Sequence, residues 1–124
     1  MRRIRWTFAA VVGPLCAGAL LACATAQRAP PAQVTVAHQL VREGALLLDV
    51  RSPADYGKAH LPGALNLPLA ELPARLAELP RDRTLVTYCN RGIQSAKAAA
   101  LLRERGFQVH DLGAMVNWGE PATR

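Results

Sequence analysis

Residues 84–105 read TLVTYCNRGIQSAKAAALLRER, and this stretch decides the fold class. Its first part, residues 84–88, is a short apolar run typical of a strand that is buried on both faces. Its last part, residues 95–105, is rich in alanine and leucine and predicts a helix that stops at Gly106. A strand that passes through a short polar loop into a helix is the repeating unit of an α/β fold.

The same alternation of strands and helices extends on both sides of this unit. Short apolar runs predict further strands at residues 34–36, 45–50, 64–67 and 107–111. Helical spacing and capping signals predict helices from residue 35 or 36 to 43, from residue 52, and from residue 69 to 79. The 124 residues allow one domain. We therefore expect an α/β fold with a mostly parallel central sheet and helices on both faces.

The first 22 residues have the layout of an export signal. Three arginines are followed by an apolar run, residues 6–22, and then by small and polar residues. A transmembrane anchor is the alternative, but the run has only about 17 residues, at the short end of what spans a bilayer. Residues 23–33 are rich in alanine and proline and predict a flexible tether, which leaves residues 34–124 for the folded domain.

The end of the signal resembles the lipoprotein box of bacteria. Residues 20–23 read LLAC, in which Cys23 would be the lipid attachment residue. Two ordinary cleavage sites, at residues 22–24 and 24–26, compete with it because both have small residues in the required positions. No aspartate follows Cys23, and by the same resemblance this favours the outer membrane. We expect a periplasmic protein that is either lipid-anchored at Cys23 or simply secreted.

The charge and cysteine content narrow the function. The formal charge is +6, from 15 Lys and Arg against 9 Asp and Glu; without residues 1–22 the counts become 12 and 9, or +3. These charges are scattered, which argues against nucleic-acid binding, and no metal-ligand spacing or cofactor motif is present. Of the three cysteines, Cys16 and Cys23 fall in or beside the signal, so the domain keeps Cys89 alone. A lone thiol in an oxidising compartment points to a chemical role.

Cys89 is the candidate nucleophile. It follows the predicted strand, at the edge of the sheet where α/β folds bind their ligands. It also precedes a helix whose first N–H groups are free to bind an anion. A cysteine in such a place is held as the reactive thiolate, and Gly92 allows the backbone to turn closely around it. A plain buried cysteine is the alternative.

This loop resembles the active-site loop of the rhodanese family. The sequence CNRGIQS, residues 89–95, follows a strand, and its pattern is similar to that of the single-domain, periplasmic phage-shock protein E type. Three more segments match in family order: LDVRSPADY (residues 48–56, with Asp55 where Glu is usual), AHLPGALNLP (residues 59–68) and LGAMVNW (residues 112–118). The resemblance implies a single rhodanese-like domain.

The resemblance also implies a thiosulfate sulfurtransferase that needs no cofactor. Cys89 would take sulfur from thiosulfate or a similar donor as a persulfide and pass it to cyanide or a thiol. The substrate-binding residues that the resemblance implies are Asn90, Arg91, Gly92, Ile93, Gln94 and Ser95. Arg91 suits a sulfonate because a guanidinium forms paired hydrogen bonds to oxyanions, with a solvated surface charge as the alternative. The small domain and its mixed surface favour a monomer.

Other functions remain open at the level of sequence. A persulfide carrier that hands sulfur to a partner protein without turnover uses the same chemistry, and a redox sensor would use oxidation of Cys89 as its signal. A cysteine phosphatase or arsenate reductase needs an arginine where this chain has Ser95. Gln94 stands where a basic residue is common, and the six residues after Trp118 leave little room for the C-terminal helix of larger rhodaneses. Both departures could weaken activity.

The remaining polar and aromatic residues have structural interpretations. We expect Arg51 to pair with Asp55 across the short helix, and Ser95 to cap the helix that follows the loop. His60 is expected to make a structural hydrogen bond rather than to act as a base. The expected places of the others are the surface for His38 and His110 and the core for Trp118.

Overall fold

Parallel strands form the centre of the computed structural model, which describes residues 30–124. The strands are β1 (Leu46–Asp49), β2 (Leu65–Asn66), β3 (Leu85–Cys89) and β4 (Val109–Ala114), and they lie side by side in the order β2-β1-β3-β4. Each neighbouring pair is parallel, as expected for strands joined by helical crossovers. The α/β class predicted from the sequence is confirmed.

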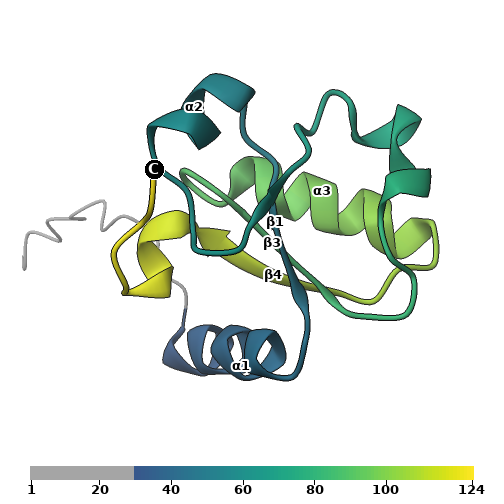
Figure 1. The fold of residues 1–124 in the computed structure, drawn as a ribbon. Coiled ribbons are helices and arrows are strands. Elements are labelled where there is room, and N and C mark those ends of the chain that lie inside the picture. Colours follow the sequence, from purple (N-terminus) through teal and green to yellow (C-terminus); the bar gives the residue numbers. More distant parts are fainter. Residues whose placement is uncertain (1–29) are drawn as a thin grey trace, which may run out of the picture.

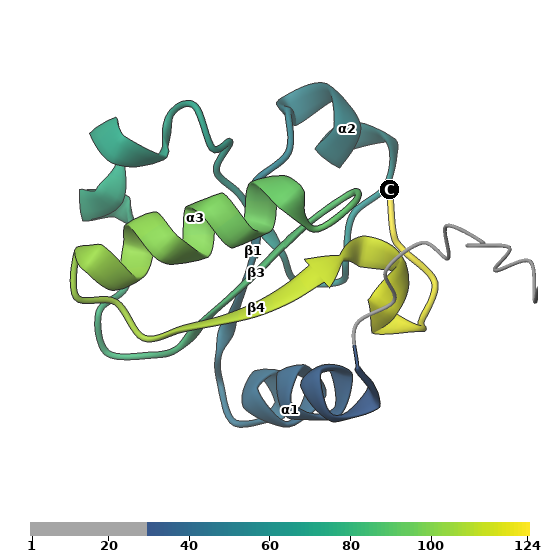
Figure 2. The same ribbon diagram turned by 180° about the vertical axis from the view of Figure 1, so that it is seen from behind.

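Helices cover both faces of this sheet. The helix α1 (Pro31–Arg42) packs on one face and α3 (Ile93–Glu104) on the other, which Figures 1 and 2 show from opposite sides. The short helix α2 (Pro53–Lys58) follows β1 and is capped by Ser52, whose hydroxyl accepts the N–H of Asp55 at 3.2 Å. A 3₁₀ turn, η3 (Met115–Trp118), follows β4 and contacts α1.

The strands are mostly apolar because successive side chains point alternately into two different cores. One core lies on the α3 face and consists of Leu48, Val50, Leu67, Leu72, Leu79, Leu85, Cys89, Ala98, Leu102 and Phe107. The other lies on the α1 face and consists of Ala37, Leu47, Leu61, Ala64, Val86, Tyr88, Leu112 and Trp118. Full burial of each large apolar side chain contributes about 1.5–3 kcal/mol. Trp118 is part of the core, as predicted.

The strand predicted at residues 34–36 is wrong, because these residues lie inside α1. Pro31 occupies the first turn of the helix, where its missing N–H costs nothing. Val34, Ala37 and Val41 recur at helical spacing and pack on the α1-face core. This packing overrides the strand preference of the β-branched side chains. Residues 31–33 therefore belong to the helix and not to the predicted tether.

The predicted export signal, the lipid attachment residue Cys23 and residues 23–29 of the tether lie outside the described residues. Within residues 30–124, no helix is both long enough and apolar enough to cross a membrane.

The helix predicted over residues 69–79 is also wrong. The chain forms two 3₁₀ turns there, η1 (Leu72–Ala74) and η2 (Leu76–Glu78). Pro73 stands in the middle of the segment, where an α-helix needs an N–H that proline lacks. The leucine spacing still had a physical meaning, since Leu72 and Leu79 are buried in the α3-face core. The four other predicted strands keep their places with shifted limits, since β1 and β2 are shorter than predicted and β3 and β4 begin and end later.

Candidate active site

Cys89 is the last residue of β3, and its sulfur lies at the N-terminus of α3. The side chain is 2% exposed. Its Sγ accepts the backbone N–H of Gly92 at 3.0 Å and the backbone N–H of Ser95 at 3.4 Å. These are free N–H groups of the first helical turn, which carry the positive end of the helix dipole. Two backbone donors aimed at one sulfur stabilise negative charge on it.

The loop can wrap around the sulfur because residue 92 is a glycine. Gly92 is the N-cap of α3 and has φ +88°, in the left-handed region that other residues rarely adopt. A Cβ at this position would lie 3.4 Å from the Cα of Gly113, at the end of the neighbouring strand β4. The glycine therefore serves both the turn and the close approach of the loop to β4.

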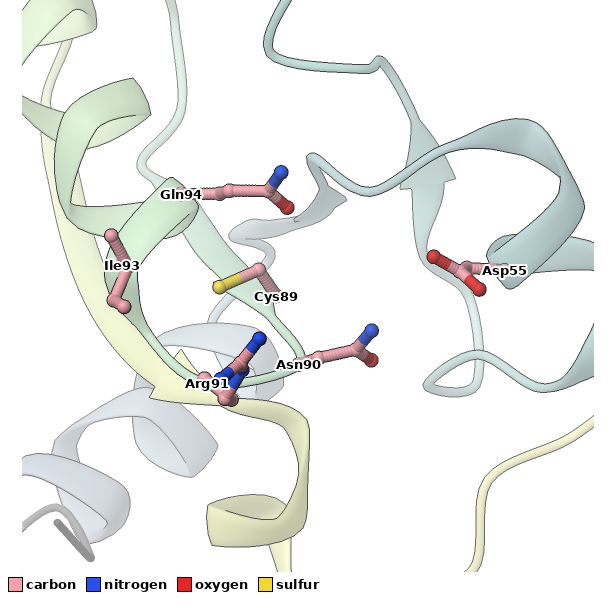
Figure 3. A pocket seen from close by; sticks show the side chains of 6 residues that line it. All are labelled: Asp55, Cys89, Asn90, Arg91, Ile93 and Gln94. Carbon is pink, nitrogen blue, oxygen red and sulfur yellow. The ribbon is translucent and has the colours of Figure 1, made fainter. Parts of the chain in front are cut away.

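A pocket of about 280 Å³ opens beside the sulfur. Its lining residues, drawn in Figure 3, are Asp55, Cys89, Asn90, Arg91, Ile93 and Gln94. The predicted loop residues thus gather at one place. Two of them, Gly92 and Ser95, contact Sγ through their backbone N–H groups. Within residues 30–124, no group of three His, Cys, Asp or Glu side chains is placed to hold a metal ion.

Asp55 is the pocket residue that the sequence analysis missed. It comes from α2, which follows β1, whereas the others come from the end of β3, the loop after it and the first turn of α3. Since β1 and β3 are parallel neighbours, the segments that follow them meet at the same edge of the sheet. The position of Asp55 in a segment that matches the rhodanese family was the available signal.

The prediction that Ser95 caps α3 is wrong. The N-cap is Gly92, and Ser95 lies three residues further on, fully buried. Its hydroxyl donates to the carbonyl of Gly92 at 3.1 Å, with the carbonyl of Gly113 at 3.4 Å as a second acceptor. The side chain therefore ties the loop to β4, while its N–H faces Cys89.

The predicted pairing of Arg51 with Asp55 is wrong as well, because Arg51 pairs with Asp49. Both are buried, with 4% and 0% of their side chains exposed, and the shortest of their contacts is 2.6 Å. The same guanidinium donates to the carbonyl of Ala59 at 2.7 Å and to Oδ1 of Asn90 at 3.0 Å. Hydrogen bonds to Asp49 raise the pKa of Arg51 above its ordinary value. A buried ion pair therefore contacts Asn90, the residue next to Cys89.

Tyr88 holds the segment after α2 against the sheet. Its hydroxyl accepts the N–H of Leu61 at 3.0 Å, and burial raises the pKa of the phenol well above its ordinary value. His60 lies beside this contact, where Nδ1 bonds to the carbonyl of Tyr56 at 2.8 Å and the two rings stack. The structural role predicted for His60 is confirmed. Its backbone also pairs with Thr123 at 2.7 Å in both directions.

The two histidines predicted at the surface are half-buried. His38 stacks on Trp118 with ring centres 3.8 Å apart, and its Nε2 bonds to the carbonyl of the same residue at 2.8 Å. His110 bonds to the carbonyl of Gln33 at 2.9 Å. Both tie α1 to the end of the chain that follows α3, so they help to hold the α1 layer in place.

Comparison with known proteins identifies the family of this chain. The model of the rhodanese-like domain matches residues 33–120. The chain belongs to this family. The rhodanese-like domain is 40% identical over 78 residues to a sulfurtransferase of Allochromatium vinosum, covering 61% of this chain and 73% of the relative. It is 36% identical over 80 residues to thiosulfate sulfurtransferase PspE of Escherichia coli, covering 62% and 77%.

A solved structure agrees with the fold. An Escherichia coli rhodanese with anions superposes with a TM-score of 0.61 and 33% identity, covering 65% of this chain and 99% of that one. In contrast, the chain spans only 20% of the length of the adenylyltransferase/sulfurtransferase MoeZ of Mycobacterium tuberculosis, to which it is 41% identical over 78 residues. The family and its sulfurtransferase members support sulfur transfer as the general class of reaction.

Proposed function

We propose that this rhodanese-like domain is a thiosulfate sulfurtransferase that works through a persulfide on Cys89. The observation that carries the proposal is the position of Sγ, which accepts two backbone N–H groups at a helix N-terminus and faces a pocket. Such donors lower the energy of a thiolate before the reaction and of an anionic persulfide after it.

The first half of the reaction loads the sulfur. The Cys89 thiolate attacks the outer sulfur of thiosulfate and forms a new S–S bond. The S–S bond of thiosulfate breaks, and sulfite leaves with the electron pair. The product is a Cys89 persulfide whose terminal sulfur carries the negative charge in the pocket lined by the loop.

The second half unloads it. Cyanide or a thiolate attacks the terminal sulfur of the persulfide, and the S–S bond to Cys89 breaks. Thiocyanate or a new small persulfide leaves, and the electron pair returns to Cys89 as the thiolate. The cycle needs no external oxidant or reductant, because the two sulfur bonds formed replace the two that are broken.

The test uses residues 24–124, which contain every helix and strand described above. We expect thiosulfate and cyanide to give thiocyanate and sulfite with the wild-type domain, and no product above the uncatalysed rate with Cys89→Ser. Mass spectrometry after thiosulfate alone should show one added sulfur on Cys89 that a reductant removes. A loaded wild type that fails to turn over would support the persulfide carrier instead, and absence of any persulfide would contradict both.

Arg91 is the candidate cation for the sulfonate group of thiosulfate. It is exposed and lines the pocket beside the nucleophile. An exposed ion pair contributes up to about 1 kcal/mol, so Arg91→Ala should lower kcat/KM for thiosulfate by up to about fivefold. Arg103→Ala, on the exposed side of α3 near its far end, is the matched control. Kinetic constants that do not differ between Arg91→Ala and wild type would remove Arg91 from this role.

We also propose that the domain works in the periplasm as a monomer, anchored to the outer membrane through lipid on Cys23. The support for the location and the anchor is the sequence of residues 1–26 alone, and the support for the monomer is the small domain with its mixed surface. Palmitate labelling of the full chain, which Cys23→Ser should abolish, tests the anchor. Release of an unlabelled mature protein would favour simple secretion.

A further inference from the structure

Besides Cys89, the pocket is lined by one acidic and one basic side chain. Arg91 supplies the positive charge from the loop after β3, and Asp55 supplies the negative charge from α2. Figure 3 shows Asp55 set apart from the others, across the pocket from Cys89 and the loop that follows it. A carboxylate in this pocket does not favour dianionic thiosulfate, because like charges repel.

The Asp55 carboxylate is available to a ligand. Its side chain is 39% exposed, and its ion-pair partner Lys58 is 80% exposed and 4.0 Å away. Such a long, solvated pair contributes little and does not immobilise the carboxylate. The nearest buried cation, Arg51, already donates to Asp49, Ala59 and Asn90. Asp55 can therefore accept a hydrogen bond or an ion pair from a molecule in the pocket.

We propose that Asp55 determines acceptor specificity by favouring small thiols that carry a protonated amine. The proposal rests on the sulfur transfer proposed above and names its second substrate. The ammonium group of an aminothiol pairs with Asp55, which brings its thiolate toward the persulfide on Cys89. The thiolate attacks the terminal sulfur, the aminothiol leaves as a persulfide, and the Cys89 thiolate is restored.

The first experiment compares two acceptors of opposite charge, cysteamine and 3-mercaptopropionate, with thiosulfate as donor. The quantity of interest is the ratio of kcat/KM for cysteamine to kcat/KM for 3-mercaptopropionate. Comparing this ratio between wild type and Asp55→Asn cancels the different intrinsic reactivities of the thiols. We expect Asp55→Asn to lower the ratio by about two- to fivefold, the range of one partly solvated ion pair.

Two variants control for net charge and for structure. Asp82→Asn removes the same charge at an exposed position in the loop before β3 and should keep the wild-type ratio. Asp55→Glu restores the carboxylate and should restore most of the ratio. A structural role of Asp55 would change both acceptors alike, so an unchanged ratio in Asp55→Asn would overturn the proposal.

A second readout separates this proposal from the proposed sulfur transfer. Methanethiosulfonates modify a thiolate directly, with methanesulfinate as the leaving group, and need no turnover. Asp55→Asn should slow modification of Cys89 by the aminoethyl reagent relative to the sulfonatoethyl reagent, again by about two- to fivefold. If the domain transfers no sulfur but this ratio falls, the proposed function fails and the charge preference of the pocket stands. An unchanged ratio overturns the charge preference whatever the activity.

Discussion

The ends of β1 and β3 lie side by side but differ in their polar contacts. Asp49 and Tyr88 are partners in the sheet register, so the two strands end at the same edge. At the end of β1, the charges of Asp49 and Arg51 are buried and form an ion pair with each other. After β3, the contacts of the Cys89 sulfur are backbone N–H groups, and a pocket opens beside it.

This difference shows how a candidate nucleophile and a buried, structural ion pair can lie at the same edge of a sheet. A buried ion pair whose two charges compensate each other acts as structure. A thiolate sulfur that accepts two N–H groups still has a third lone pair for nucleophilic attack. The hydrogen bond from Arg51 to Asn90 joins the two, so the ion pair at the end of β1 helps to position the loop that follows β3.

The largest expected effect comes from breaking the buried ion pair at the end of β1. Arg51→Met should lower the free energy of unfolding by about 3–5 kcal/mol, because the fully buried Asp49 carboxylate loses its partner. Urea denaturation of residues 24–124 measures it. Activity should fall with stability because Asn90 also loses its donor.

The control removes both charges. Asp49→Leu combined with Arg51→Met should recover part of the loss, since an apolar pair needs no compensation for buried charge. A cost below about 1 kcal/mol for Arg51→Met alone would contradict the view that the end of β1 is a closed ion pair.

Tyr88 sharpens the comparison, because it precedes Cys89 but faces the core on the α1 side. Tyr88→Phe leaves the buried N–H of Leu61 without its acceptor and should cost about 1–3 kcal/mol near neutral pH. Burial raises the pKa of the folded phenol, so its contribution is complete below the ordinary value near 10 and is lost as the pH rises from there.

Wild type should therefore lose stability above pH 10 by about 1.4 kcal/mol per pH unit more than Tyr88→Phe does. Urea denaturation at a series of pH values from 8 to 11 gives the two slopes. Parallel slopes would show that the phenol ionises as readily in the folded protein as in the unfolded chain.

The smallest expected effect concerns the turn in the loop after β3. Gly92→Ala should cost about 1–2 kcal/mol, the price of a left-handed conformation for an L-residue, and should lower activity because the N–H that contacts Sγ moves. Gly57→Ala in α2 is the control, because a Cβ there meets nothing within 4 Å. We expect that variant to be neutral or slightly stabilised, as measured by thermal unfolding. Equal stabilities would contradict the tight turn.

Sequence reasoning succeeded where neighbours along the chain decide the structure. The apolar runs of β1 and β3 predicted a buried parallel sheet, and the change from strand to helix placed Cys89 at the N-terminus of α3. It failed where local preference and packing disagree. The β-branched residues 34–36 became helical, and Pro73 divided a stretch with helical leucine spacing into two turns.

By itself, then, the sequence determined the class of fold, the position of Cys89 between a strand and a helix, and the loop around it, because strand period, helix signals and the glycine turn are properties of consecutive residues. Only the tertiary structure decided the partner of Arg51, its bond to Asn90 and the place of Asp55 in the pocket. Arg51 and Asn90 are 39 residues apart in the chain. Their contact depends on which strands lie next to each other in the sheet, and no local pattern encodes that order.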